Sequence, residues 1–320
     1  MAQRINWNEW FRWVIFVISI IMSVYNAEEY LNAAIQSIIN QTYSDWELII
    51  INDSSNDESY NIMNKCAERD SRIRIINNAQ NLGLTKSLNI GIDSAKGEYI
   101  ARLDADDVAD PTRLEKQINY LKENPDVVLV GTGGYIVDEN GDILNSIRVV
   151  KNRYLIKKML LYGNLFVHSS LMVKKDALVG IGKYRSKFVH SQDYDLILRL
   201  NEHYSLANLS EPLTYWRFSG TNSTVNKFLL QRACADIAIQ FAKERMKYGR
   251  DTYDSVDFTK LIQDTISKNK KTYVCDFSIY SAVYAGHLKE AFFGFCSALV
   301  QGLIPKNTMS RALIGLGALF

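Results

Sequence analysis

Between residues 14 and 122 the sequence alternates apolar, β-branched segments with amphipathic ones, and this order constrains the fold more than any other feature. The apolar segments at 14–24, 46–51, 73–76 and 97–101 predict strands. The segments between them place apolar residues at helical spacing, as Leu31, Ile35 and Ile38 do. A repeated strand–helix–strand order predicts an α/β fold with a mainly parallel sheet, helices on both faces and right-handed crossovers.

Polar residues follow each predicted strand at the point where it ends. They are Tyr25 and Asn26, then Asp53, then Asn77 and Asn78, then Asp104 to Asp107. Because ligands of open α/β sheets collect at the carboxyl ends of the strands, these four ends predict one site. No Gly-x-Gly-x-x-Gly follows the first strand, which argues against a dinucleotide-dependent dehydrogenase.

The acidic cluster Asp104, Asp106 and Asp107 follows a buried strand and needs a cation. Carboxylate oxygens are hard ligands, so Mg²⁺ or Mn²⁺ that shares its coordination with a phosphate is favoured over zinc. The spacing of Asp104 and Asp106 sends both carboxylates to one side of an extended backbone, toward one metal ion bound to a diphosphate. The structural alternative is an Asp-rich turn without a ligand.

Composition excludes some classes of partner. The chain has 320 residues and a formal net charge of +2, which gives no polyanion-binding signature, so nucleic acid is not an expected partner. Its four cysteines are far apart and form no Cys-x-x-Cys, which indicates free thiols in a reducing compartment and therefore a cytoplasmic location.

The two ends differ from the middle of the chain. Residues 1–13 form an aromatic N-terminal extension, for which an interfacial membrane anchor and a packed segment are equally open. Residues 226–320 predict a helical C-terminal region. Its apolar runs are shorter than the ~20 residues that cross a bilayer, so we expect helices that lie on the membrane or pack on the preceding domain.

Four blocks now carry a resemblance to a known family. In order, 19–28, 52–57, 81–89 and 101–107 resemble the motifs of family 2 glycosyltransferases of the GT-A fold, which is Rossmann-like, and the likeness extends over about 14–223. Three positions depart from the family pattern. Ser23 replaces a proline, Asn52 replaces the first Asp of Asp-Asp-Gly-Ser, and Ser54 replaces its glycine.

The resemblance implies a GT-A domain at 14–225, with a nucleotide-binding half at about 14–110 and an acceptor half at about 111–225. It implies an inverting, metal-dependent transfer of one sugar from a nucleotide-sugar, a UDP-sugar, to an acceptor hydroxyl. The acceptor would be a saccharide or lipid-linked saccharide of a bacterial surface polysaccharide (O-antigen, capsule or exopolysaccharide), made at the cytoplasmic face of the inner membrane with peripheral membrane contact. No Gln-x-x-Arg-Trp motif of processive synthases is present.

On the donor side the resemblance assigns the nucleotide to Tyr25, Asn26 and Glu28, and the uracil N3–H to Asp53, whose alternative role is a helix N-cap. Lys86 is either a diphosphate contact or a solvated helix lysine. Asp104 would face the ribose and the metal, and Asp106 would ligate the metal. Arg217 would contact the diphosphate, while Ser219 stands where the family often has a histidine.

On the acceptor side, 191–200 predicts a helix with acidic residues in its first turn. This segment is similar to the motif Glu-Asp-x-Asp-Leu-x-x-Arg-Leu, so Asp193 takes the place of the general base, with Asp195 as its competitor and Gln192 in place of the Glu. His168 is expected in a strand that enters the site, or else as a satisfied half-buried histidine.

Two other functions are alternatives to sugar transfer. A sugar nucleotidyltransferase would need a Gly-rich basic loop after the first strand, and 25–28 is neither. A catalytically silent nucleotide-sugar-binding protein is the second alternative, to which the substitutions at Asn52 and Gln192 point.

Overall fold

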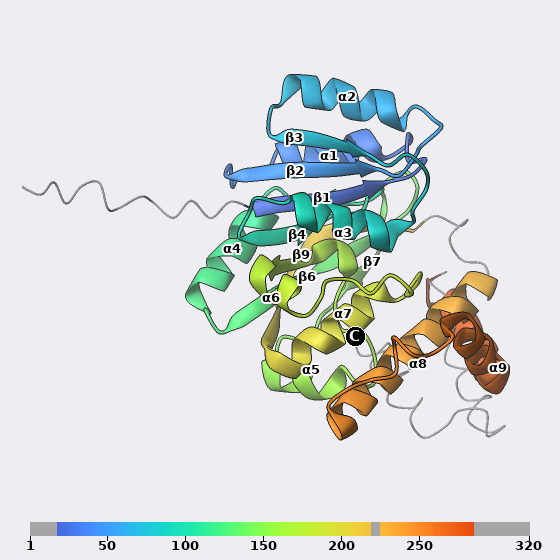
Figure 1. Ribbon diagram of the computed structural model, residues 1–320. Coiled ribbons are helices and arrows are strands. Elements are labelled where there is room, and N and C mark those ends of the chain that lie inside the picture. Colours follow the sequence, from blue (N-terminus) through green and yellow to red (C-terminus); the bar gives the residue numbers. More distant parts are fainter. Residues whose placement is uncertain (1–17, 219–224, 285–320) are drawn as a thin grey trace, which may run out of the picture.

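The computed structural model describes residues 18–218 and 225–284. In this part of the chain one sheet runs in the order β3-β2-β1-β4-β8-β6-β9-β5, with β7 paired to β6 (Figure 1). The strands are β1 (Ile18–Val24), β2 (Trp46–Asn52), β3 (Ile73–Asn77), β4 (Tyr99–Arg102), β5 (Val108–Ala109), β6 (Val127–Val137), β7 (Ile143–Ile147), β8 (Met172–Lys174) and β9 (Ser205–Arg217). The helices are α1 (Leu31–Ile39), α2 (Ser59–Arg69), α3 (Leu84–Ser94), α4 (Arg113–Glu123), α5 (Arg153–Met159), α6 (Lys175–Gly180), α7 (Gln192–His203), α8 (Val225–Tyr248) and α9 (Phe258–Tyr284).

The first four strands confirm the predicted α/β order. β1 pairs in parallel with β2 and β4, and β2 pairs in parallel with β3. β8 is antiparallel to both β4 and β6, and so joins the two halves of the sheet. The predicted first strand began at residue 14, and 14–17 lie outside the described residues.

Helices cover both faces of the sheet, which explains why its central strands are apolar without alternation. In β1, Ile20 and Met22 face one core with α1, α2 and α4, whereas Ile21 faces a second core with α3, α6 and α7. Because successive side chains of a strand point to opposite faces, a strand buried on both sides must be apolar throughout.

The glycines of 131–134 lie within β6, where they allow a close approach to β9. A Cβ atom on Gly134 would lie 2.5 Å from the carbonyl oxygen of Thr214, and one on Gly131 would lie 2.4 Å from Asn208 Oδ1. A side chain at either position would therefore clash with β9. A turn at 138–142 joins β6 to β7, with Gly141 at φ +92°.

The C-terminal region begins with α8, which packs against α7 and α9. No helix within residues 18–218 or 225–284 combines the length and apolar character that crossing a bilayer requires. The aromatic extension 1–13, Ser219 and the tail beyond residue 284 lie outside the described residues.

Candidate functional site

The loops that follow β1 and β2 hold each other through side chains. Asn26 Oδ1 accepts a hydrogen bond from the backbone N–H of Asn56 at 3.0 Å, and Glu28 Oε2 accepts one from Glu58 at 2.8 Å. Asn26 has φ +49°, a left-handed conformation that asparagine tolerates better than most residues. Tyr25 exposes 53% of its surface. Asn26 and Glu28 therefore shape the loop, and the Tyr25 ring is the part accessible to a base.

Asp53 is only 2% exposed and organises the start of α3. Its Oδ1 accepts hydrogen bonds from Asn78 Nδ2 at 2.7 Å and the Leu82 N–H at 2.8 Å, and its Oδ2 accepts one from the Gly83 N–H at 2.8 Å. It does not cap the helix that follows it, because α2 begins at Ser59. A carboxylate has about four lone-pair sites, so Oδ2 keeps one for a further donor.

Asn52, which differs from the family motif, forms a side-chain hydrogen bond with Asn77 on β3. Asn52 Nδ2 donates to Asn77 Oδ1 at 3.0 Å, and Asn52 Oδ1 accepts from the Ser55 N–H at 3.0 Å. A carboxylate at this position would place an acceptor against the Asn77 carbonyl. The amide thus keeps the end of β2 hydrogen-bonded without the usual aspartate.

At the end of β4, Asp104 lies against a buried arginine. Arg102 is 4% exposed and its Nη2 lies 2.5 Å from Asp104 Oδ1, a charge contact that lacks the angle of a hydrogen bond. Ser169 Oγ donates to Asp104 Oδ2 at 2.7 Å. Burial acts to raise the pKa of Asp104, but Arg102 and Ser169 outweigh it and the pKa is lowered. Asp104 is therefore ionised over the physiological range.

Asp106 and Asp107 lie in surroundings that disfavour their charged forms. Burial, and then the charge of Asp104, raises the pKa of Asp106 to about 6. Asp107 is 1% exposed, and burial followed by the charges of Asp104 and Asp106 raises its pKa well above the usual range. One Asp107 oxygen accepts from the Arg217 N–H at 2.9 Å, whereas Oδ2 is buried without a hydrogen-bond partner.

Arg217 ties this acidic loop to the turn after β6. Its Nε donates to the Asp106 carbonyl at 3.0 Å, and its Nη1 donates to the carbonyls of Asp138 and Glu139 at 2.7 and 2.9 Å. The guanidinium also lies 4.2 Å from the centre of the Tyr30 ring. Among the described residues Nη2 has no hydrogen-bond partner, so it is the nitrogen that could contact a diphosphate. Lys86, in the first turn of α3, is exposed to solvent.

The donor set of the acidic loop fits a hard divalent cation that is shared with a ligand. Within the described ranges, no group of three or more His, Cys, Asp or Glu residues could hold a metal ion. Mg²⁺ commonly binds through one or two carboxylates together with substrate phosphates. After burial, the charge of Asp104 is the next cause of the raised Asp106 pKa. A cation bound between the two carboxylates would offset this repulsion.

The two acidic residues in the first turn of α7 differ in their surroundings. Asp195 is fully buried, and its Oδ2 accepts a hydrogen bond from Arg199 Nε at 2.9 Å. Its Oδ1 lies 3.6 Å from Arg185 Nη1. Asp193 is half-buried, and its Oδ2 accepts a hydrogen bond from Asn164 Nδ2 at 2.8 Å. Burial is the largest cause of a raised Asp193 pKa. The geometry thus leaves Asp193 as the carboxylate available to a substrate.

Tyr184, which the sequence motifs did not single out as a site residue, is near enough to both Asp104 and Asp193 for their charges to act on it. The charges of both Asp193 and Asp104 act on its hydroxyl, and burial is the largest cause of its raised pKa. Asn89 of α3 fixes its backbone, since Nδ2 donates to the Tyr184 carbonyl at 2.8 Å and Oδ1 accepts from its N–H at 3.1 Å. The motif Gly-Lys-Tyr before α7 was the signal that could have revealed it.

His168 contacts the Tyr184 hydroxyl through Nε2 at 2.9 Å. It begins the 3₁₀ turn His168–Ser170 and not a strand, so that prediction is wrong, while the reading as a satisfied, half-buried histidine is confirmed. Burial, and then the charge of Arg102, lowers the His168 pKa to about 3. The ring is therefore neutral at physiological pH, and serves as a hydrogen-bonding support for Tyr184.

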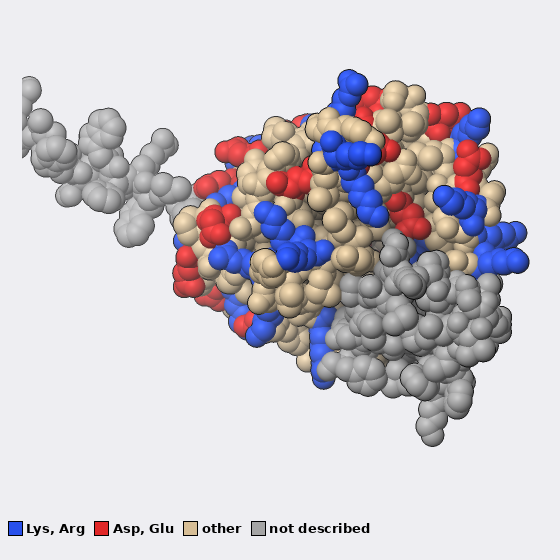
Figure 2. Space-filling model, turned by 90° about the horizontal axis from the view of Figure 1, so that it is seen from below, with Lys and Arg blue, Asp and Glu red and all other residues tan. Residues whose placement is uncertain are grey.

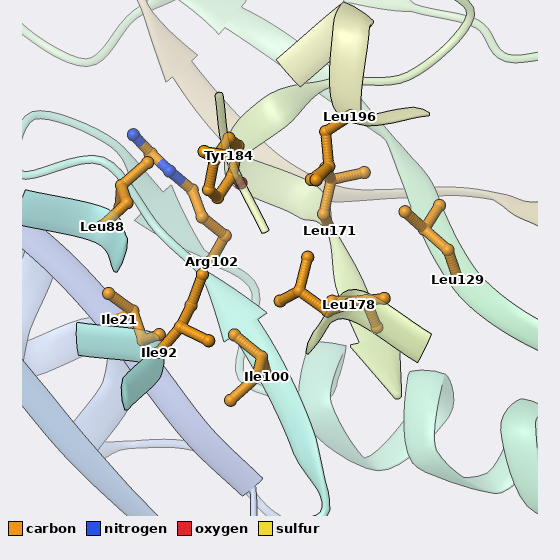
Figure 3. A pocket seen from close by; sticks show the side chains of 11 residues that line it. Ile21, Leu88, Ile92, Ile100, Arg102, Leu129, Leu171, Leu178, Tyr184 and Leu196 are labelled. Atoms are coloured by element: carbon orange, nitrogen blue, oxygen red, sulfur yellow. The ribbon is translucent and has the colours of Figure 1, made fainter. Parts of the chain in front are cut away.

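Beneath these groups lies an apolar cavity (Figure 3). Arg102 and Tyr184 border it together with Leu88, Leu171 and Leu196, and the guanidinium and the phenol ring lie side by side at its edge. Its lining is otherwise aliphatic, so it belongs to the core between the sheet and α3, α6 and α7. The Arg102 guanidinium and the Tyr184 hydroxyl lie at the boundary between this core and the candidate site.

A mostly parallel α/β sheet with polar loops at the ends of β1 and β2, an acidic loop after β4 and a carboxylate on α7 defines a transferase of the GT-A type. The family model described as "Glycosyl transferase family 2" matches residues 19–180, and the chain belongs to this family. It is therefore a glycosyltransferase.

Named relatives agree with this assignment. The chain is 39% identical to the O-antigen biosynthesis glycosyltransferase WbnJ of Escherichia coli, over 72% of this chain and 91% of that protein. It is 31% identical to the UDP-Glc:alpha-D-GlcNAc-diphosphoundecaprenol beta-1,3-glucosyltransferase WfgD of Escherichia coli, over 67% and 81% of the two chains. The structure of S. aureus TarS 1-349 in complex with UDP-GlcNAc superposes with a TM-score of 0.58 at 14% identity, covering 89% of this chain and 92% of that one, which shows the shared fold.

Proposed function

We propose that this chain is an inverting, metal-dependent glycosyltransferase that moves one sugar from a UDP-sugar to an acceptor hydroxyl in surface polysaccharide biosynthesis. Support comes from the activities for which relatives are named: O-antigen biosynthesis for WbnJ, and for WfgD a UDP-Glc donor with a diphosphoundecaprenol-linked acceptor. With a lipid-linked saccharide acceptor, the proposed reaction would take place at the cytoplasmic face of the inner membrane, with the enzyme in peripheral contact with it.

On the donor side, the exposed Tyr25 ring offers a stacking surface for the base, and the unused lone pair of Asp53 Oδ2 can accept the uracil N3–H. Asp104 and Asp106 would hold Mn²⁺ or Mg²⁺ against the diphosphate. When bound, the ion offsets the negative charge that develops on the leaving UDP. Arg217 Nη2, at the end of β9, and the exposed Lys86, on α3, would add positive charge for the diphosphate.

On the acceptor side, Asp193 removes the proton of the attacking hydroxyl. Asn164 holds Oδ2, so Oδ1 is the oxygen available as the base, and the raised pKa makes it a stronger base than an exposed aspartate. Attack from the face opposite the leaving UDP gives inversion at the anomeric carbon. A hydrolase would need a second carboxylate as the leaving-group acid.

One observation supports this proposal: Tyr184 contacts His168, whose neighbour Ser169 donates to Asp104, and the charges of both Asp104 and Asp193 act on Tyr184, as expected if the proposed base and the proposed metal ligand share one site. The test is nucleotide release from a panel of UDP- and GDP-sugars with Mn²⁺ or with EDTA, in the presence of saccharide acceptors. We expect release with one UDP-sugar, dependent on Mn²⁺, and the opposite anomeric configuration in the product by NMR. A purified chain that binds no sugar nucleotide with Mn²⁺ present would disprove the proposal.

A further inference from the structure

The segment 143–175 has no acidic residue, although the chain contains 35 of them. Its basic residues are Arg148, Lys151, Arg153, Lys157, Lys158, Lys174 and Lys175. Lys174 and Lys175 donate to backbone carbonyls of Pro125 and Ala95, so their heads are occupied within the fold. The others lie in or just before α5, which concentrates positive charge on one part of the surface.

Most of this charge is unpaired. Arg153 forms an ion pair with Asp126 at 2.8 Å. Arg148, Lys151, Lys157 and Lys158 are exposed, and within the described ranges they make no ion pair. Like charges that lie close together on a surface repel one another unless an anion neutralises them. This cluster therefore suits a ligand with several negative charges.

Apolar side chains are exposed among these cations. Tyr154 is 64% exposed, Leu155 44% and Tyr162 43%, and Lys158 Nζ lies 4.4 Å from the centre of the Tyr154 ring. Ile156, between them, is fully buried and anchors α5 to the core. The α5 surface, defined as Arg148, Lys151, Tyr154, Leu155, Lys157, Lys158 and Tyr162, thus combines aromatic, aliphatic and basic groups on a fixed support.

Figure 2 views the molecule from the end at which α5 lies in Figure 1, and shows Lys and Arg side chains spread over uncharged surface, with Asp and Glu side chains also on this face. Such a mixture suits the headgroup region of a bilayer, where tyrosine and leucine enter the interface and lysines meet lipid phosphates. A nucleic acid would use the lysines but would leave Leu155 exposed. The chemistry accordingly favours a lipid surface.

We propose that the α5 surface docks the protein on an anionic lipid bilayer. This inference rests on the proposed function, which includes peripheral membrane contact. It adds the surface of the protein that makes this contact. The same segment continues to Leu160, whose carbonyl accepts the Tyr194 hydroxyl at 2.5 Å, and to Asn164, which contacts Asp193. A bilayer held at α5 is therefore adjacent to the acceptor side of the site.

The test is sedimentation of the full chain with vesicles of phosphatidylglycerol and phosphatidylcholine, compared with vesicles of phosphatidylcholine alone. Each basic residue near an anionic surface strengthens binding about fivefold, so K157Q/K158Q should weaken partitioning by roughly 30-fold at low salt. Y154S/L155S should weaken it on anionic vesicles as well. Raising the salt concentration should reduce wild-type binding, because these charges are screened.

The matched control is K65Q/R69Q on α2, which removes the same charge from exposed positions at the opposite end of the molecule (Figure 1). We expect it to bind as the wild type does. Equal losses in the control and in K157Q/K158Q would show a net-charge effect and overturn the proposal. So would wild-type binding by K157Q/K158Q, which would place membrane contact elsewhere, or equal binding to neutral vesicles.

Nucleotide release without vesicles separates this proposal from the proposed function. K157Q/K158Q should retain wild-type release with a water-soluble acceptor, and its thermal unfolding midpoint should be unchanged. A wild-type chain that binds anionic vesicles but releases no nucleotide would contradict the proposed function and leave the docking surface standing.

Discussion

At the scale of single residues, the first turn of α7 gives two neighbouring aspartates different tasks. Replacing Asp193 by Asn should reduce nucleotide release by about 10²–10⁴-fold with little change in stability, because a positioned general base contributes on that order. Asn164 can still hydrogen-bond the amide oxygen, so the local structure should persist. Release is measured with donor and acceptor at saturation, and stability by thermal unfolding.

Asp195 provides the contrast. Its replacement by Asn leaves Arg199 without its charge partner in a buried setting, which typically costs about 3–5 kcal/mol of unfolding free energy. Urea unfolding followed by circular dichroism measures this loss. If D195N were as stable as the wild type and inactive, while D193N kept its activity, the assignment of the base would have to be reversed.

Asp106 makes a prediction about pH. Because its pKa is raised to about 6, it becomes protonated as the pH falls through 6 and loses the charge that a cation needs. At sub-saturating Mn²⁺ we expect activity to fall on the acid side near pH 6. Since the metal and the proton compete for the carboxylate, a higher Mn²⁺ concentration should move this limb to lower pH. An acid limb that does not respond to Mn²⁺ would mean that Asp106 is not a ligand.

At the scale of elements, α8 and the loop after it hold the segment that leads into α7. Asp251 is bound by Arg185 Nη1 at 2.7 Å and by Arg245, which also pairs with Glu202 of α7 at 2.7 Å. Beside them, the buried Phe188 stacks on Tyr253. From the other side, Thr85 Oγ1 of α3 donates to the Phe188 carbonyl at 2.7 Å. The segment 181–190 is thus fixed between α3 and α8.

We therefore predict that D251N is destabilised by about 2–4 kcal/mol, because two guanidinium groups are left facing each other with little solvent. Its matched control is D126N, which breaks the exposed ion pair with Arg153 and should cost less than about 1 kcal/mol. Urea unfolding of both variants makes the comparison. Equal losses of unfolding free energy in D251N and D126N would show that α8 does not support α7.

The elements also show what local sequence patterns can and cannot predict. The first four strands and their helices were predictable because apolar periodicity is a property of neighbouring residues. The pairing of β8 between β4 and β6 was not, since it joins residues far apart in the sequence. The error at His168 has a local cause: Ser170 Oγ donates to the Val167 carbonyl at 2.8 Å and favours a turn over a strand.

In the candidate site, the sequence motifs predicted where residues lie better than what their side chains do. Asn26, Glu28 and Arg217 lie where the strand ends converge, but their side chains are largely used to hold loops together. Tyr184 and Arg102 were missed as site residues because their importance depends on burial and on charges brought near by the fold. Such surroundings cannot be read from residue type and spacing.

For the whole molecule, the proposed division into a sugar-donor side and an acceptor side predicts which variants lose the thermal stabilisation that UDP and Mn²⁺ provide. A ligand at about a hundred times its Kd that binds only the folded state adds about 2.7 kcal/mol, which corresponds to a rise of roughly 5 °C in Tm. UDP with Mn²⁺ should produce such a rise, and UDP with EDTA a smaller one. D106N should lose the Mn²⁺-dependent part, because it loses a metal ligand.

D193N should keep the full rise, since the proposal assigns Asp193 to the acceptor and not to the nucleotide. Differential scanning fluorimetry of the wild type, D106N and D193N, each with UDP, Mn²⁺ or both, measures these effects. The joint pattern matters more than any single shift. If D193N lost the Mn²⁺-dependent stabilisation as D106N does, both carboxylates would belong to the donor side, and the base would have to be sought on another element.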